Sequence, residues 1–298
     1  MDLNSFILSF CLIVFGLFFY KYFFLFIKKY NSKLLIDDEF KKPQSFHEFP
    51  VSISGGIGIF LSFLILFFYF FLSKQIFYYE YLSFCSFFFI LGLSDDLKLN
   101  IRPKFRLLMM IIILVILMIS NKFYVENTGI GFLNRLLETD IFALSFMCLC
   151  FLFIINGSNL IDGYNGLLGI HSIIILSNLF FVNYLNGNKD LAFFILFSIL
   201  IITVFLKFNF PKARIFLGDG GSYFLGAFIA TTVIKTNISN PEISPFYFCI
   251  LLFYLFFEVF FSFVRKIILE RKSPLFPDGK HLHMIIYKNL LKKNNNKL

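Results

Sequence analysis

The stretch Asn156-Gly-Ser-Asn159-Leu-Ile-Asp162-Gly-Tyr-Asn165-Gly166 joins two long apolar runs, Ile141 to Ile155 and Leu167 to Leu185. We interpret the two runs as membrane-crossing helices. No lysine or arginine lies between Asp140 and Lys189. An aspartate in such surroundings is costly unless a metal ion, or a cationic pocket built from other loops, supplies positive charge. The alternative interpretation is a plain polar turn between two helices, and the rest of the chain has to decide between them.

Composition restricts the class of protein. The 298 residues are 58% hydrophobic and only 15% charged, with a mean hydropathy of +0.81. Several apolar runs reach the roughly 20 residues that a helix needs to cross a bilayer. We therefore predict an all-α, polytopic membrane helix bundle. The five cysteines show no C-x-x-C spacing, so neither a disulfide framework nor a zinc site is indicated. The net charge of +9 is not interpreted as nucleic-acid binding, because its distribution along so apolar a chain matters more than its sum.

The apolar runs and the basic residues predict a topology. Alternating the sides of the connections places 22 of the 27 lysines and arginines on one side. The positive-inside rule makes that side cytoplasmic, so the N-terminus is expected outside and the C-terminus inside. We predict about nine to ten transmembrane helices in one domain over residues 1–298, and a short interfacial helix from Met284 to Leu291. The candidate spans are 5–27, 52–73, 79–94, 105–120, 141–155, 166–185, 190–206, 220–234 and 246–264.

Four polar clusters fall on the predicted cytoplasmic side. Each one alone has a plain structural interpretation, such as a charged loop or a turn with a helix cap. Their convergence on one membrane face, from four separate connections, favours a functional site. The clusters are the 156–166 link, Asp95-Asp96 with the basic residues after it, Gly218-Asp219-Gly-Gly-Ser222, and Asp278-Gly-Lys-His281-Leu-His283.

These residue types suit a diphosphate substrate with a divalent cation. Asp and Asn oxygens suit Mg²⁺, which keeps one or two protein carboxylates and takes its other ligands from phosphate and water. Lysine, arginine and histidine neutralise phosphate oxygens. The pair Asp95-Asp96 could supply a base or a second metal contact, and the glycines beside Asp219 let backbone N–H groups face an anion. Glu258, inside the last span, is either a paired intramembrane carboxylate or close to a cavity.

The motifs resemble those of the polyprenyl-phosphate N-acetylhexosamine-1-phosphate transferases, the integral membrane enzymes of glycosyltransferase family 4. The resemblance extends from about residue 37 to residue 283. Its motifs are His47-x-x-Pro50 with Gly55-Gly56, Asp95-Asp96, Asn156-x-x-Asn159-x-x-Asp162-Gly-x-Asn165-Gly, Phe216-Leu-Gly-Asp219-x-Gly-Ser, and Asp278-x-x-His281-Leu-His283. The chain departs from the family pattern at Ser52-Ile53, Gly279 and Met284.

The resemblance implies a reaction and a set of roles. Such enzymes move a sugar-1-phosphate from a UDP-N-acetyl sugar to a polyprenyl phosphate such as undecaprenyl phosphate, release UMP, and begin the assembly of a cell-envelope glycan at the bacterial inner membrane. Asp219 and Asn159 resemble the Mg²⁺-binding pair, with Mn²⁺ left open as a substitute. Asp95, Asp96 and Asp162 resemble the catalytic carboxylates. The residues expected to bind substrate are Asn156, Asn165, Lys104, His281 and His283.

Other interpretations stay open at this point. Phospho-MurNAc-pentapeptide transferase is the alternative within the enzyme class. A cation-coupled membrane transporter would place carboxylates near the middle of the membrane, whereas all but Glu258 are predicted at cytoplasmic ends of spans. A catalytically inactive scaffold would not need Asp95, Asp96, Asp162 and Asp219 together. The sequence does not distinguish the sugar transferred, the polyprenol length, a one-step from a two-step mechanism, or a monomer from a homodimer.

Overall fold

The computed structural model describes residues 3–29, 35–37, 50–99, 101–121, 123–125, 127–273 and 279–295. His47 and Asp278, which belong to two of the predicted motifs, lie outside these residues. In chain order, the elements are α1 (Leu3–Lys29), β1 (Ile36–Asp37), β2 (Val51–Ser52), α2 (Gly55–Lys74), α3 (Tyr79–Asp96), α4 (Pro103–Asn121), α5 (Gly131–Leu137), α6 (Asp140–Ile161), α7 (Leu167–Leu185), α8 (Lys189–Asn209), α9 (Gly218–Ser239), α10 (Pro245–Leu251), α11 (Phe253–Val264), the π-helix η1 (Arg265–Leu269) and α12 (Leu282–Asn295).

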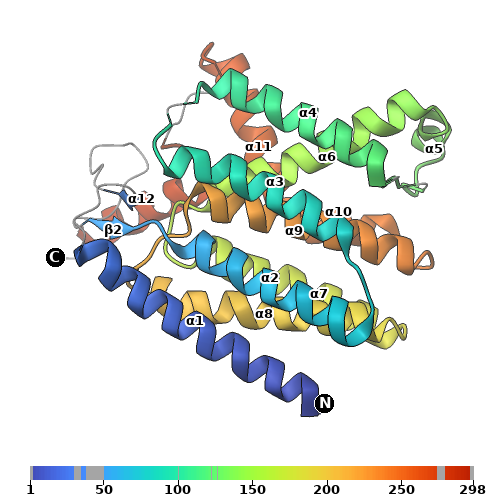
Figure 1. The fold of residues 1–298 in the computed structure, drawn as a ribbon. Helices are drawn as coiled ribbons and strands as arrows, with labels where there is room; N and C mark the ends of the chain where they lie inside the picture. Colours follow the sequence, from blue (N-terminus) through green and yellow to red (C-terminus); the bar gives the residue numbers. More distant parts are fainter. Residues whose placement is uncertain are drawn as a thin grey trace.

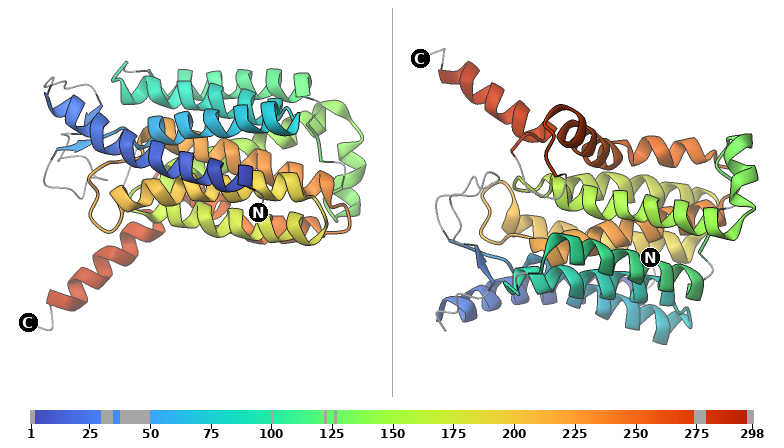
Figure 2. Two further views of the ribbon diagram at one scale, coloured as in Figure 1. Left: turned by 60° about the horizontal axis from the view of Figure 1, so that its bottom comes forward. Right: turned by 90° about the horizontal axis from the view of Figure 1, so that it is seen from above.

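The long helices run side by side in one bundle (Figures 1 and 2). Among the described residues, six helices are long and apolar enough to cross a membrane, or seven if a bent pair counts as one span. This confirms an all-α, multi-pass membrane protein. The structure has a helix at each of the nine predicted positions, but α3 and α9 are not among those six. The number of spans and their orientation therefore stay predictions.

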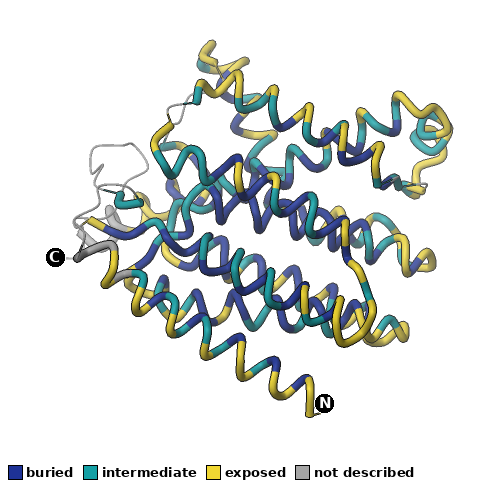
Figure 3. Tube along the Cα trace, in the orientation of Figure 1, coloured by how far each residue is buried: buried dark blue, intermediate teal, exposed yellow. Residues whose placement is uncertain are grey.

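Helix α9 forms the centre of the bundle. Every residue from Gly220 to Ile234 is buried, and this part of the helix is dark blue in Figure 3, in contrast to the exposed outer face of α1. Small residues explain how its neighbours come so close, because they let helix backbones approach one another. A Cβ at Gly226 would lie 2.7 Å from the Ile155 Cα of α6. The α9 sequence is rich in Gly, Ala, Ser and Thr because it packs against protein rather than lipid.

A short two-stranded sheet precedes α2 and holds the N-terminus of α2 against the N-terminus of α9. β1 and β2 are antiparallel, with Ile36 opposite Ser52. The backbone O of Ser52 accepts a hydrogen bond from the Phe216 N–H at 2.8 Å, and Gly55 N–H donates in turn to the Phe216 O at 2.9 Å. The loop before α9 is therefore fixed by a neighbour that is more than 150 residues away in the chain.

Two predicted boundaries were wrong. We expected the ninth span to be continuous over 246–264, but it breaks at Leu252 into α10 and a second part from Phe253 to Leu269, with a bend of 66°. Leu252 leaves the helical region there, at φ −95° and ψ 1°. We also expected the 156–166 stretch to be a link throughout, but α6 continues to Ile161. Gly157 lets this last turn pack against the α11 backbone, since a Cβ there would lie 2.6 Å from the Leu255 O.

Helix α12 covers the residues predicted as a short interfacial helix and extends away from the bundle (Figure 2). Its helical structure is confirmed. Its contact with the membrane surface stays a prediction.

Candidate active site

The carboxylate of Asp96 caps the first turn of α9. Oδ1 accepts a hydrogen bond from the Asp219 N–H at 2.8 Å, and Oδ2 accepts one from the Gly220 N–H at 2.9 Å. The first N–H groups of a helix have no partner within it and carry partial positive charge, so a carboxylate is favourable there. The predicted pair at the end of α3 therefore lies directly against the predicted motif at the start of α9.

Only glycine fits at the point where this contact is made. Gly218 has a φ of +80°, a left-handed conformation that other residues rarely adopt. A Cβ there would lie 2.4 Å from the Ile53 Cγ2 and 2.7 Å from the Asp96 Oδ2. The glycine thus allows both the turn into α9 and the approach of the carboxylate.

Asp219 itself turns toward α6. Its Oδ1 accepts a hydrogen bond from the Asn159 Nδ2 at 2.8 Å, and the same Nδ2 is 3.0 Å from the Ser222 Oγ. The predicted metal-binding pair is therefore in direct contact, although the two residues are 60 positions apart. The side chain of Asp219 is 39% exposed, so the carboxylate is not sealed inside the bundle.

Arg106 pairs with two of these aspartates, Asp95 and Asp219. We did not predict it as a site residue. Its Nη1 pairs with the Asp95 Oδ2 and lies 3.8 Å from the Asp219 Oδ2. Its guanidinium also lies over the Tyr223 ring, 5.8 Å from the centroid, a favourable cation–π arrangement. The sequence signal was present but unspecific, because Arg106 is one of four basic residues that follow the acidic pair.

Asp162 lies in the loop after α6, close enough to Asp219 and Asp96 for their negative charges to act on its carboxyl group. Burial raises the pKa of Asp162 well above its ordinary value, and the charges of Asp219 and Asp96 raise it further. A carboxyl group whose neighbours disfavour its ionised form lies in an excess of negative charge. The cluster thus holds Asp95, Asp96, Asp162 and Asp219, with the Arg106 guanidinium in contact with two of the four.

Among the described residues, four carboxylates and one guanidinium meet here, and such a group of charges could hold a cation. Mg²⁺ prefers hard oxygen ligands and takes only one or two carboxylates from the protein, with phosphate and water as the rest. The Asp219 carboxylate and the Asn159 amide offer such oxygens. Among the described residues, no group of three His, Cys, Asp or Glu side chains is placed so that it could hold a metal ion by itself.

The loop that carries Asp162 is fastened to the loop before α9. Asn209, at the end of α8, accepts a hydrogen bond from the Gly166 N–H at 2.6 Å and donates one to the Ile215 O at 2.9 Å. Asn165 adds a bond from Nδ2 to the Pro211 O at 3.0 Å. Asn209 was also missed, since one asparagine at a helix end carries no specific sequence signal.

For two predicted substrate residues, Asn156 and Lys104, the structure gives no contact with the four carboxylates within the described part of the chain. Asn156 turns back on its own helix, where its Nδ2 donates to the Leu152 O at 2.8 Å. Lys104 is exposed in the first turn of α4. The structure brings together Asp95, Asp96, Asn159, Asp162 and Asp219, and it leaves these two at the margin.

The tail meets the Asp162 loop through His283. His281 and His283 are buried, and the His283 ring lies edge-on to the Tyr164 ring, with centroids 5.3 Å apart. Burial and the neighbouring Tyr287 raise the pKa of Tyr164 to about 12, so its hydroxyl is neutral at physiological pH. The tail thus packs against one side of the loop 162–166.

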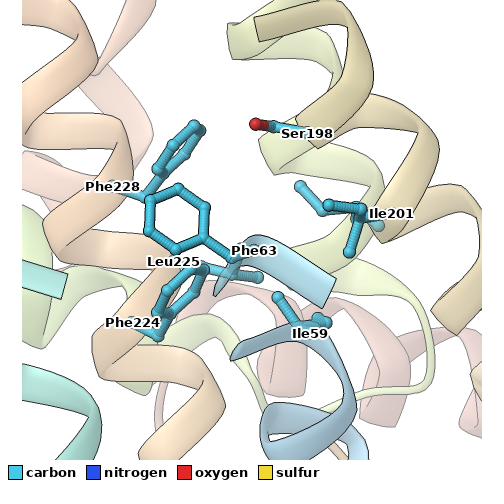
Figure 4. Close-up of a pocket in the computed structure, with 8 residues that line it drawn as sticks. Ile59, Phe63, Ser198, Ile201, Phe224, Leu225 and Phe228 are labelled. Atoms are coloured by element: carbon cyan, nitrogen blue, oxygen red, sulfur yellow. The ribbon is translucent and has the colours of Figure 1, made fainter. Parts of the chain in front are cut away.

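The pocket drawn in Figure 4 is a different feature. It lies between α2, α8 and α9, and its one polar side chain, Ser198, donates to the Phe194 O of its own helix at 2.9 Å. It has no charged group to bind a phosphate. The lining residues are Ile59, Phe63, Ser198, Ile201, Ile202, Phe224, Leu225 and Phe228.

Comparison with known proteins gives a consistent result. The model of glycosyl transferase family 4 matches residues 78–237, the range that contains all four carboxylates. The undecaprenyl-phosphate alpha-N-acetylglucosaminyl 1-phosphate transferase of Thermotoga maritima is 30% identical over 236 residues, which are 79% of this chain and 68% of that protein.

Two further relatives match over shorter ranges. A probable undecaprenyl-phosphate N-acetylglucosaminyl 1-phosphate transferase of Bacillus subtilis is 30% identical over 65% of this chain and 54% of its own length. A phospho-N-acetylmuramoyl-pentapeptide-transferase of Dictyoglomus turgidum is 33% identical over half of each chain. This chain thus spans about half the length of these two relatives.

Proposed function

Because the chain belongs to glycosyl transferase family 4, we propose that it transfers an N-acetylhexosamine-1-phosphate from a UDP-sugar to undecaprenyl phosphate and releases UMP. The observation that carries the proposal is the acidic cluster. Its four carboxylates come from three separate segments of the chain and meet at the N-terminus of α9. That arrangement suits a diphosphate that arrives with a divalent cation.

The reaction we propose is a direct displacement. An oxygen of the lipid phosphate attacks the β-phosphorus of the UDP-sugar, and the bond from that phosphorus to the bridging oxygen breaks. The bridging oxygen leaves with UMP, and the lipid carries the sugar on a new diphosphate. No water is consumed. Positioning and electrostatic stabilisation account for most of the rate in such transfers.

Asp219 and Asn159 are the residues that would hold the cation. A bound Mg²⁺ would neutralise charge on the diphosphate oxygens. Arg106 lies beside the same Asp219 carboxylate, at 3.8 Å, so its guanidinium can supply further positive charge to phosphate oxygens.

The geometry favours a positioning role for Asp96. Both of its oxygens accept backbone N–H groups of α9, so it holds the helix that carries Asp219 in place. Asp95 is paired with Arg106. The lipid phosphate is already ionised near pH 7, so the attacking oxygen needs little help from a base.

We further propose that the cluster faces the cytoplasm in a bacterial inner membrane, with the N-terminus outside. The distribution of the 27 lysines and arginines supports this orientation. The alternative activity is that of a phospho-MurNAc-pentapeptide transferase, because relatives of that name match half of the chain. The two activities differ in the sugar of the donor.

The proposal is tested by UMP release from purified protein in detergent. The reaction contains undecaprenyl phosphate, Mg²⁺ and a panel of UDP-N-acetyl sugars that includes UDP-MurNAc-pentapeptide. We expect release to need the lipid and to fall at least about 100-fold in Asp219→Ala, as for loss of a principal electrostatic group. Asp140→Ala is the matched control, because Asp140 is exposed at the other end of α6. Folded wild-type protein that releases no UMP with any donor would contradict the proposal.

A further inference from the structure

Glu258 is a fully buried carboxylate within an otherwise apolar helix. Its residue is 0% exposed, and its helix, α11, has the sequence FYLFFEVFFSFV. An ionisable group in such a place is costly unless it is paired and hydrogen-bonded. We therefore infer the role of Glu258 from the groups that its carboxylate contacts.

The Glu258 carboxylate contacts three residues of the tail after η1, as well as Tyr254 of its own helix. Oε2 lies 3.1 Å from the His281 Nδ1, and Oε1 accepts the Leu282 N–H at 3.0 Å. The His283 Nδ1 is 3.7 Å from Oε1 and 3.4 Å from the hydroxyl of Tyr254, one turn before Glu258 in the same helix. One carboxylate thus gathers three consecutive residues of the tail.

The far side of His283 faces the loop that carries Asp162. A Cβ at Gly163 would lie 2.9 Å from the His283 Nε2, so that nitrogen points at the loop backbone. His283 is only 9% exposed. Among the described residues, its Nε2 has no hydrogen-bond partner. A buried nitrogen without a partner is costly in a resting protein, and it is useful where a substrate supplies the missing bond.

We propose that Glu258 is a positioning residue, which holds His281 and His283 against the Asp162 loop so that the His283 Nε2 can contact a phosphate oxygen of the sugar donor. This inference rests on the proposed function and adds to it a residue that touches no substrate itself. A carboxylate behind a histidine fixes both its ring orientation and the nitrogen that carries the proton. Glu258 thereby connects α11 to the site through the tail.

Glu258→Gln tests the role because glutamine keeps the shape and removes the charge. The amide can still accept from the Leu282 N–H, but it no longer offers a carboxylate to His281. We expect the KM for the UDP-sugar to rise about tenfold or more, as for loss of a partner that orients a binding histidine, while the KM for undecaprenyl phosphate is unchanged. Such a split is not expected from a general loss of folded protein.

The chain offers a matched control. Glu80 is also a buried glutamate, and it pairs with Lys235 at 2.6 Å at the other ends of α3 and α9. Glu80→Gln should lower the thermal stability and leave both KM values unchanged. If Glu258→Gln fails to fold, Gly163→Ala replaces it. Its Cβ displaces the His283 ring and should raise the same KM.

A spectroscopic readout separates this inference from the activity. The chain has four histidines, so ¹⁵N NMR of histidine-labelled protein in bilayers reports which ring nitrogens carry protons, with His281→Asn and His283→Asn as assignments. Glu258→Gln should change the His281 signals and Glu80→Gln should not. Unchanged His281 signals in Glu258→Gln, or kinetics that match those of Glu80→Gln, would overturn the inference. A wild-type protein that releases no UMP would overturn the proposed function instead, and the NMR result would still decide whether Glu258 orients the histidines.

Discussion

Gly92→Ala should separate α3 from α9 and misplace the acidic cluster. Gly92 lies one turn before Asp96 in α3. A Cβ there would lie 2.3 Å from the Asp219 O, 2.5 Å from the Asp219 C and 2.6 Å from the Gly220 N. These are backbone atoms of α9, which cannot rotate out of the way as the end of a flexible side chain can.

The size of the effect follows from these distances. Ordinary contacts of a Cβ begin at 3.4 Å, so the two helices must part by about 1 Å. The hydrogen bonds from Asp96 to the Asp219 and Gly220 N–H groups, now 2.8 and 2.9 Å, would then stretch to about 3.9 Å, which is too long for a hydrogen bond.

Two opposing terms decide the sign. Replacing a mid-helix glycine with alanine favours the helix by about 1 kcal/mol. Overpacking costs about 1–3 kcal/mol, and each lost hydrogen bond to a charged group costs about 1.5–3 kcal/mol. The losses exceed the gain. Activity should fall more steeply than stability, because a misplacement of about 1 Å at a reacting centre can cost about 100-fold in rate.

The assay is UMP release by detergent-purified protein, normalised to the monodisperse fraction on size exclusion, with thermal unfolding measured in parallel. Gly131→Ala is the control, because nothing lies within 4 Å of its Cβ position. A Gly92→Ala protein with wild-type kcat and wild-type Tm would refute the claim that the contact of α3 with α9 holds the site.

Three further perturbations follow from the same cluster. Arg106→Gln leaves Asp95 without its cation and should lower kcat at least about tenfold, with partial recovery in Arg106→Lys, as measured by UMP release and thermal unfolding. Chelation with EDTA should abolish UMP release, and added Mg²⁺ or Mn²⁺ should restore it; full activity after chelation would contradict the proposed cation. Burial raises the pKa of Asp162, and the charges of Asp219 and then Asp96 raise it further. Without a metal ion, the folded state therefore keeps a proton on the Asp162 carboxyl at pH values where the unfolded state, whose aspartate pKa is about 4, has released it. Its stability should therefore fall as the pH rises from about 4 toward the raised pKa. Asp162→Asn should raise the Tm in EDTA at pH 8 and change it little at pH 4, and an equal gain at both pH values would contradict this.

Hydropathy predicted where the helices lie, because each predicted span is helical in the structure, although the ninth consists of two helices. It could not predict the break at Leu252, since no proline or glycine marks it. Nor could it predict that α6 continues to Ile161, because the glycine and asparagines of that turn favour a loop in isolation. The contact of Gly157 with the Leu255 backbone, which supports the last turn, depends on a helix about 100 residues further along the chain.

The sequence predicted that the four carboxylates would lie close together, and it did not predict which groups they contact. The predicted membrane side of each loop placed four carboxylates on one face, and in the structure they lie close together. They are Asp95, Asp96, Asp162 and Asp219. Asp96 caps α9 and Asp95 pairs with an arginine, and this division depends on how two helices cross. The spacing of residues along the chain does not predict that crossing. Arg106 and Asn209 were missed for the same reason. Glu258 was recognised as unusual, and only the structure identifies the tail histidines as its partners.

The most direct test of the proposed reaction is the stoichiometry of its two products. Purified protein is given undecaprenyl phosphate, Mg²⁺ and the best UDP-N-acetyl sugar, and UMP and the lipid product are measured by mass spectrometry in the same reaction. We predict one UMP for each undecaprenyl diphosphate that carries the sugar, with neither product formed by Asp219→Ala. Release of UDP in place of UMP, or a lipid that carries the sugar on a single phosphate, would contradict the account.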